Sequence, residues 1–276
     1  TTASNNTAVG KNALFANTTG ASNVAVGSGA LDANTTASNN TAMGDGSLGA
    51  NTTGASNTAV GKDALLVNTT ASNNTALGFQ SLRLNTTGTN NVAVGQGALD
   101  ANTTANGNIA VGANSLGSNT TGASNIGIGH EALGANTTAS NNTAIGYGSL
   151  DANTTGANNT ALGFSSLSAN ISGTLNTAVG RSALTSDTKG NHNVALGYNA
   201  LTSQNFTSAT DVHNTAIGSA SGASVTTGIR NTLIGGIAGN GMTTGDNNTA
   251  VGYTAMAGVV TGDGNTAVGT RAMFTH

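Results

Sequence analysis

Three basic side chains towards the carboxyl-terminal end come nearest, by type and spacing, to forming a chemical site. His192, His213 and Arg230 each directly precede an Asn, in successive copies of a short repeat. If the segments that carry them stack as parallel strands about 4.8 Å apart, the three side chains share one edge. Such an edge predicts an anion or metal site, or a pH-sensitive contact with a partner. The alternative, which we favour, is a solvent-exposed edge that accepts any polar residue.

Other patterns that resemble active-site motifs do not form a convincing catalytic site. Gly44 to Gly49 match the dinucleotide-binding pattern G-x-G-x-x-G, but that motif needs a strand before it and a helix after it. Ser and Thr are so frequent that a Ser near a His and an Asp is expected by chance. A nucleophile also needs a pocket and an orienting base. We therefore predict that the chain is not an enzyme, with no catalytic residue, no cofactor and no bound metal.

The composition excludes several classes of protein. The 276 residues carry a net charge of −3, only 6% are charged, 3% are aromatic, and Trp, Pro and Cys are absent. Disorder usually requires high net charge together with low hydrophobicity, so a patterned repeat protein fits better. Seven Lys and Arg residues form no cationic stripe, so no nucleic-acid partner is expected. No apolar run of about 18 residues exists, so this segment is not expected to enter a membrane.

The elements that must position these residues are sixteen copies of one short repeat. Its anchor reads Asn-x-Ala-aliphatic-Gly, and its Gly recurs with a 17-residue period from Gly10 to Gly197, then once after a 21-residue step, then with the first period again. Such a unit is too short for two helices and a loop, but it fits one coil of a solenoid with short strands. The predicted fold is therefore all-β: a parallel β-solenoid of 16 coils, in which each coil is one 17-residue repeat.

Each row of equivalent residues is expected to stack along the solenoid. In Asn-Thr-Ala-Val the side chains alternate between two faces. We place the Val9 row inside with Thr7 beside it, the Ala8 row outside, and the Leu14 row inside as a second apolar row. Asn17 to Gly20 form a polar turn. The predicted core residues are Val9, Leu14, Val26 and Leu31.

Two further rows have predicted structural roles. The opening Asn is present in every copy, and stacked Asn side chains can form an amide ladder. The anchor Gly provides a bend with a residue that is free to adopt positive φ. The predicted ladder and bend residues are Asn6, Asn23, Asn40, Asn57, Gly10, Gly27, Gly44 and Gly61.

The small Ala8 row suggests close packing between copies. An uncharged strip of small residues along a rod suits lateral contact, and from it we predict a homotrimeric rod. The alternative is that Ala simply fits a tight coil.

The repeat resembles two families. Asn-x-Ala-Val-Gly repeats are similar to the head repeats of trimeric autotransporter adhesins of the YadA type. The longer N-T-A-V-G-x-x-A-L-x-x-N-T-T-G unit resembles the shaft repeats of phage tail fibres, and the resemblance covers nearly the whole chain. It implies a left-handed parallel β-roll, a homotrimer and a role in surface attachment.

The chain divides into a regular part and a variant part. Residues 1–201 form the regular solenoid, and residues 202–276, after the 21-residue step, are the predicted junction to a further module. The predicted function is the structural shaft of an extracellular trimeric fibre or adhesin, at a cell surface or on a virion. It would contact a host-surface glycan or receptor through a tip outside this segment.

An alternative function is a solenoid whose outer face itself binds a ligand such as a glycan or ice. Regular Thr18 and Thr19 rows favour ice binding, whereas a Thr7 row placed inside would argue against it.

Overall fold

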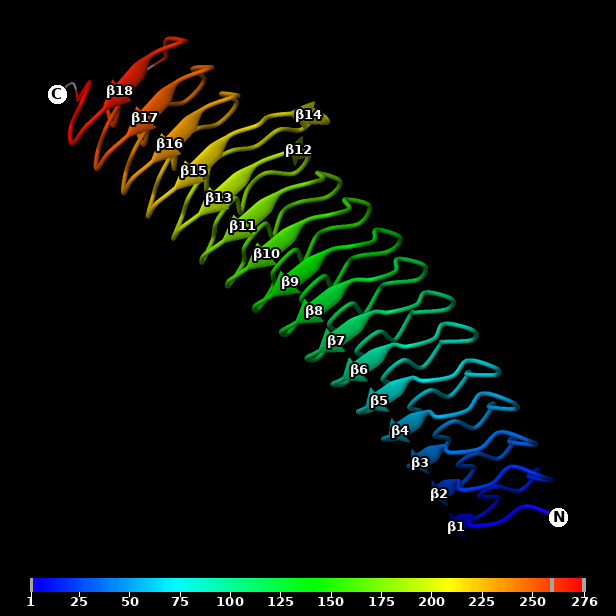
Figure 1. The fold of residues 1–276 in the computed structure, drawn as a ribbon. Coiled ribbons are helices and arrows are strands. Elements are labelled where there is room, and N and C mark those ends of the chain that lie inside the picture. Colours follow the sequence, from blue (N-terminus) through cyan, green and yellow to red (C-terminus); the bar gives the residue numbers. More distant parts are fainter. Residues whose placement is uncertain (1, 259–260, 275–276) are drawn as a thin grey trace. The chain divides into compact units, whose positions relative to one another are not determined.

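The computed structural model describes residues 2–258 and 261–274, and its described part is an all-β parallel β-solenoid without helices (Figure 1). Each of the sixteen coils contributes one three-residue strand. Successive strands pair in parallel and in register, so that Thr7 lies beside Val24, Ala8 beside Ala25 and Val9 beside Val26. The fold class predicted from the 17-residue period is confirmed.

The chain divides into two compact units, Thr1–Thr138 and Ala139–His276, each of which is described by itself. The strands of the first unit are β1 (Thr7–Val9), β2 (Val24–Val26), β3 (Thr41–Met43), β4 (Thr58–Val60), β5 (Thr75–Leu77), β6 (Val92–Val94), β7 (Ile109–Val111) and β8 (Ile126–Ile128). Those of the second are β9 (Thr143–Ile145), β10 (Thr160–Leu162), β11 (Thr177–Val179), β12 (Gly190–Asn191), β13 (Val194–Leu196), β14 (Thr210–Asp211), β15 (Thr215–Ile217), β16 (Thr232–Ile234), β17 (Thr249–Val251) and β18 (Thr266–Val268).

The 21-residue step does not disturb the main sheet of the second unit. Val194 in β13 pairs with Thr215 in β15 as its equivalents do elsewhere. The additional residues lie at one corner of the coil, where β12 and β14 pair as a small separate sheet. Figure 1 shows this pair beside the main row of strands. The insertion therefore leaves the register of the main sheet unchanged, and Phe206 and Val212 within it are buried.

Each coil turns its corners at residues with positive φ. In the second coil these are Gly27 at +139°, Gly29 at +65°, Leu31 at +51° and Asn39 at +63°. Leu31 is fully buried, although a left-handed conformation costs a residue with a Cβ about 1–2 kcal/mol. Burying a leucine side chain offsets that cost with about 1.5–3 kcal/mol. The αL conformation is thus maintained by packing.

The prediction for the two faces of the strand is wrong. The alanines of the Ala8 row from Ala25 onward are 0–2% exposed and point inward, whereas Val9 is 58% exposed and Val26 half-buried. The reason is space, as the one glycine in the Ala8 row demonstrates. A Cβ added at Gly127 would meet Ser115 Oγ at 2.6 Å, the Ala132 carbonyl at 3.0 Å and Leu116 Cγ at 3.3 Å. The buried Leu row already fills the interior, so the strand can turn only its smallest side chain towards it.

The later coils of the second unit redistribute the core volume. The Leu row becomes Gly222 and Gly239 there, and the inward Ala becomes Leu233, which is fully buried. A Cβ at Gly222 would lie 2.7 Å from Leu233 Cδ1, and a Cβ at Gly239 would lie 2.6 Å from its Cδ2. One large side chain on the strand therefore replaces two from the opposite corner. A junction to a further module in residues 202–276 stays a prediction.

Candidate functional site

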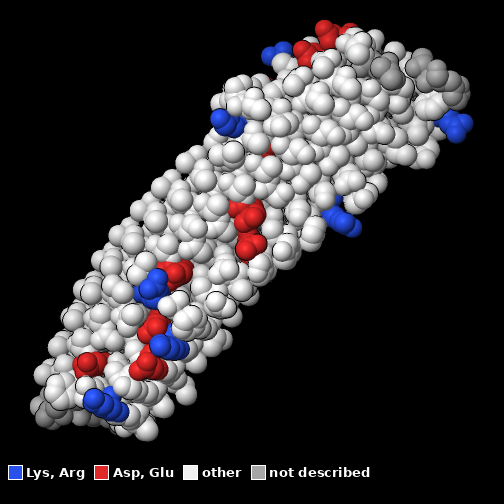
Figure 2. Space-filling model, turned by 180° about the vertical axis from the view of Figure 1, so that it is seen from behind, with Lys and Arg blue, Asp and Glu red and all other residues white. Residues whose placement is uncertain are grey.

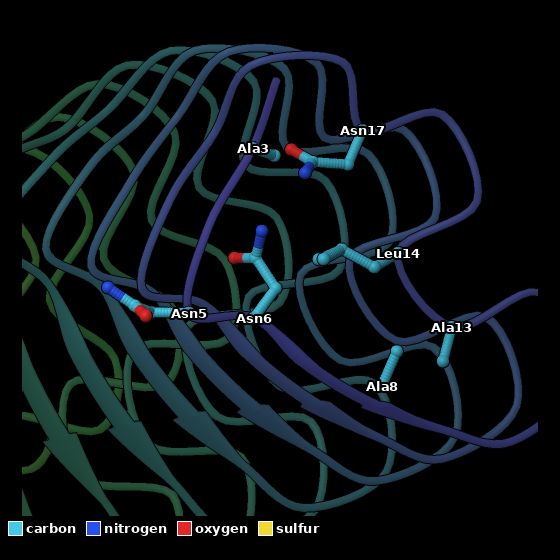
Figure 3. Close-up of a pocket in the computed structure, with 7 residues that line it drawn as sticks. All are labelled: Ala3, Asn5, Asn6, Ala8, Ala13, Leu14 and Asn17. Atoms are coloured by element: carbon cyan, nitrogen blue, oxygen red, sulfur yellow. The ribbon is translucent and has the colours of Figure 1, made fainter. Parts of the chain in front are cut away.

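Two rows of buried Asn form a hydrogen-bonded lining of each coil. In the first coil Asn6 Nδ2 and Asn17 Nδ2 both donate to the Gly20 carbonyl, at 2.8 and 3.0 Å. Figure 3 shows both amides pointing into the interior together with Leu14. The same convergence recurs in the second coil at the Ala37 carbonyl. Each of these two coils thus closes on a carbonyl held by two side-chain amides.

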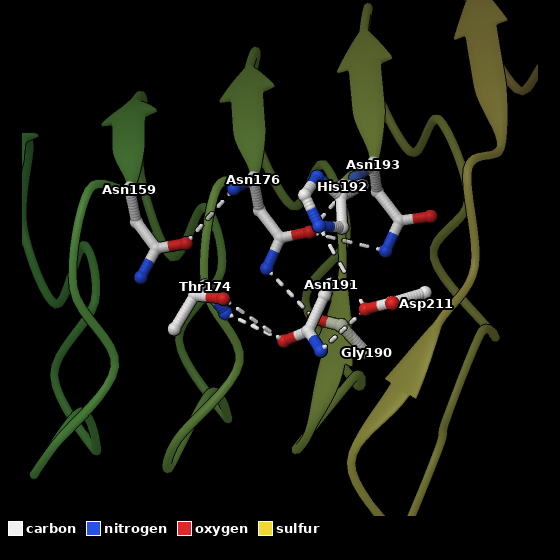
Figure 4. Close-up of polar contacts among 8 residues, drawn as sticks. All are labelled: Asn159, Thr174, Asn176, Gly190, Asn191, His192, Asn193 and Asp211. Carbon is white, nitrogen blue, oxygen red and sulfur yellow. Dashed lines mark hydrogen bonds and ion pairs between the residues drawn. The ribbon is translucent and has the colours of Figure 1, made fainter.

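The two Asn rows connect neighbouring coils in different ways. In the Asn6 row, Oδ1 accepts the backbone N–H of the next Asn, as from Asn23 at 2.8 Å. Figure 4 shows the same bonds along Asn159, Asn176 and Asn193 of the second unit. The regular amide-to-amide ladder lies instead in the Asn17 row, where Asn34 Nδ2 donates to Asn17 Oδ1 at 3.0 Å. Asn17 is therefore an interior residue, whose side chain bonds across the turn to Gly20.

The predicted structural residues occupy the following places. Asn23, Asn40 and Asn57 are fully buried, and Asn6 in the first coil is half-buried. The anchor glycines adopt φ between +123° and +139°. They also approach the next coil closely, since a Cβ at Gly10, Gly27 or Gly44 would lie 2.4–2.5 Å from its carbonyl oxygen. Both the conformation and the contact require glycine at these positions.

The outward face of the strands carries a continuous aliphatic row within each unit. In the first unit it runs from Val9 through Met43 and Leu77 to Ile128, and in the second from Ile145 to Val268. Leu77 and Leu162, for example, are 46% and 44% exposed. The Thr7 row flanks it and also points outward, contrary to prediction. On the face that Figure 2 presents, Lys, Arg, Asp and Glu side chains are scattered among a surface formed mostly by other residues. The row is thus an aligned and partly exposed apolar surface in each unit.

The predicted edge of basic residues is partly assembled. The rings of His192 and His213 stack with centroids 4.8 Å apart, and both backbones lie in the αL region, at φ +61° and +56°. His192 Nε2 lies 3.7 Å from Asp211 Oδ1, which also accepts a hydrogen bond from Asn191 Nδ2 at 3.1 Å (Figure 4). Arg230 follows in the same αL row, at φ +57°. A role of this edge in binding a partner stays a prediction.

One buried acidic residue, Asp187, was not predicted from the sequence. Asp187 takes the place of an Asn in the Asn17 row and is 1% exposed. Its carboxylate accepts bonds from Gln204 Nε2 at 2.7 Å, from Phe206 N–H at 2.9 Å and from Gly190 N–H at 3.1 Å. Burial raises the pKa of Asp187 above its ordinary value, and these hydrogen bonds partly oppose the rise. Its position one repeat after Asn170, in the Asn17 row, is the sequence feature from which it could have been predicted.

Comparisons with known proteins supply no family. Neither the models of known protein families nor the curated proteins yielded a match to the chain. Over residues 2–258 and 261–274, no group of three or more His, Asp or Glu side chains could hold a metal ion. The same residues contain no helix with the length and apolar character needed to cross a membrane. The fold itself defines the class: a repeat protein with a β-solenoid architecture.

Proposed function

We propose that this chain is the structural shaft of an extracellular trimeric fibre or adhesin, such as a phage tail fibre or a cell-surface filament, with no catalytic role. The observation that carries the proposal is the regularity of the interior. In the first unit the same buried Asn, Ala and Leu rows repeat from coil to coil, and in the second unit the Ala and Leu rows do so as far as Leu201. A solenoid in which each coil contacts only its neighbours is suited to spacing two ends apart.

Self-association is supported by a different surface from the one predicted. The buried Ala row cannot mediate contact between copies. The outward aliphatic row can do so, because it is aligned, uncharged and partly exposed along each unit. Burial of apolar area contributes about 25 cal/mol per Å², so a long row can hold copies together. Three copies, each turning this row towards a common axis, form the trimer that we propose.

A direct test combines the mass in solution with substitutions on the two kinds of surface. Leu77→Lys together with Leu162→Lys places one charge in the aliphatic row of each unit. We expect the trimer mass to fall to that of a monomer, with the far-ultraviolet circular dichroism unchanged. The control is Gln96→Lys, which adds one lysine at an exposed position beside the row. A monomeric unmodified chain would refute the trimer, and a trimer that tolerates both lysines would refute this interface.

Binding of ice by the outer face is a second candidate. The Thr7 row points outward, so the argument against ice binding no longer holds. In the Thr18 row the hydroxyls are engaged, since Thr18 Oγ1 donates to the Thr35 carbonyl at 2.9 Å. The neighbouring row, which includes Thr36, Thr53 and Thr70, is exposed. Thermal hysteresis of the purified chain, lost on Thr53→Lys, would support this function, and its absence would exclude it.

A further inference from the structure

The amide ladder of the second unit is interrupted at Asp187, two coils before the same row becomes apolar at Val225 and Met242. Along the Asn17 row each bond runs in one direction, from Nδ2 of one coil to Oδ1 of the coil before it, as from Asn170 to Asn153 at 2.8 Å. Gln204 continues this direction by donating to Asp187 Oδ2. In the described part of the chain, no hydrogen bond joins Asp187 to Asn170. An ionised carboxylate has no hydrogen with which to make that bond.

The surroundings of Asp187 fix the orientation of its neighbours. Gln204 Oε1 accepts a bond from Asn214 Nδ2 at 2.8 Å, so its amide cannot turn round without losing that partner. Gln204 and Asn214 are both fully buried. The direction of the chain of hydrogen bonds from Asn214 through Gln204 to Asp187 is thereby determined. Between Asn170 and Gln204, the position at which a further hydrogen would join the ladder is the carboxyl group of Asp187.

We propose that Asp187 is an internal proton-binding site. Its neutral carboxyl group completes the asparagine ladder by donating to Asn170, so the coils around the 21-residue step are more stable at acid pH than near neutrality. Charged groups lie nearby on the adjoining segments: Lys189 on the same turn, His192 beside β12, and Asp211 and His213 at and after β14. The hydrogen bonds to the carboxylate come instead from backbone amides and from the neutral Gln204 side chain.

The shift in the pKa of Asp187 has the direction that this geometry predicts. The pKa of Asp187 is raised because burial disfavours the charged form. The folded state therefore binds more protons than the unfolded state between the two pKa values. The stabilisation is complete below the unfolded pKa, which is about 4, and is lost as pH rises through the folded value.

Hydrogen exchange measured over residues 185–206 of the whole chain, between pH 7 and pH 4, tests the proposal. After correction for the intrinsic exchange rate, we expect protection to rise as the pH falls, by up to about tenfold per pH unit for one linked proton. Asp187→Asn, which has a permanent donor and no titratable group, should lose this dependence. Residues 101–122 span the ladder residues Asn102 and Asn119 without any titratable side chain, and serve as an internal reference.

A second variant keeps the test decisive if Asp187→Asn does not fold. His192→Asn together with His213→Asn removes the imidazoles while leaving the carboxyl group, and the pH dependence should persist. Its disappearance in that variant would assign the effect to the histidines and overturn the proposal. The proposal would also fail if Asp187→Asn kept the dependence, or if protection fell as the pH fell.

Discussion

Enlarging one inward alanine tests how the core divides its space between the strand and the opposite corner. Ala76 in β5 is fully buried, as are Leu82 in the same coil and Leu65 in the coil before it. These three residues correspond in position to Leu233, Gly239 and Gly222 of the second unit. Ala76→Leu therefore introduces the large residue without removing the two that it displaces.

The second unit indicates how severe the crowding is. Around Leu233, a mere Cβ at either glycine would approach a Leu233 methyl group to 2.6–2.7 Å, a distance that real Cβ atoms essentially never show. With complete leucines at both corners, the overlap must be relieved by shifts of the side chains or backbone. We expect Ala76→Leu to lower the free energy of unfolding by about 3 kcal/mol, the upper end of the usual cost of overpacking.

The same comparison predicts a rescue. Adding Leu65→Gly and Leu82→Gly to Ala76→Leu reproduces the arrangement around Leu233 and places glycine where φ is +50°. We expect the triple variant to be more stable than the sum of its separate changes by at least about 1 kcal/mol, as coupled core residues commonly are. The rescue should be incomplete, because Val225 and Met242 also enlarge the apolar core of the second unit, at positions equivalent to Asn68 and Asn85.

Unfolding in guanidinium chloride, followed by circular dichroism on the whole chain, measures these energies. Gln96→Leu is the control, since it adds an apolar side chain at an exposed position and should change the free energy of unfolding by less than about 0.5 kcal/mol. Our account of the interior would be refuted if Ala76→Leu were as well tolerated as the control. Strictly additive energies would show that the exchange between Leu233 and the two glycines is not a packing effect.

Four other substitutions probe separate parts of the coil. Gly95→Ala should lower the free energy of unfolding by about 3 kcal/mol or more and lower the melting temperature, because the added Cβ would lie 2.6 Å from Gly112 and φ is +134°. Gly29→Ala is the comparison: its Cβ would meet open space, so it should lower the free energy of unfolding by only about 1–2 kcal/mol, because of its positive φ. Asn102→Leu should cost about 1–3 kcal/mol in urea unfolding, since it leaves neighbouring amide partners unsatisfied in the ladder, and an unchanged midpoint would contradict that role. Arg83→Ala removes the ion pair with Asp100 and should cost less than about 1 kcal/mol, an effect that disappears in 1 M salt.

The period of the repeat made most of the fold predictable. A strict 17-residue recurrence of Asn, Ala, aliphatic and Gly positions leads to one strand per coil, parallel pairing and a bend at each anchor glycine. It also indicates which rows are structural, because they scarcely vary between the copies. Asp187 was equally accessible from the sequence, as the one acidic residue at a position of the Asn17 row, although only burial and its hydrogen-bond donors give that substitution meaning.

The face of the strand that lies inside could not be predicted from the periodicity. Alternation within Thr-Ala-Val separates its side chains into two faces, but a strand of three residues does not indicate which face is inside. Hydrophobicity alone favours Val9 inside, and this was wrong. Which face lies inside depends on Leu31 and its equivalents. Their αL backbone directs large side chains across the coil and leaves room on the strand only for Ala.

The sequence by itself determined the period, the coil and the bend at each anchor glycine, because those follow from the recurrence of glycine and asparagine along the chain. Only the tertiary structure decided which side chains form the outer surface of the coil. Because the Leu and Asn rows fill the interior, the aliphatic residues of the strand lie at the surface. An aligned apolar row faces outward in each unit for that reason, and it is where we expect the copies to meet.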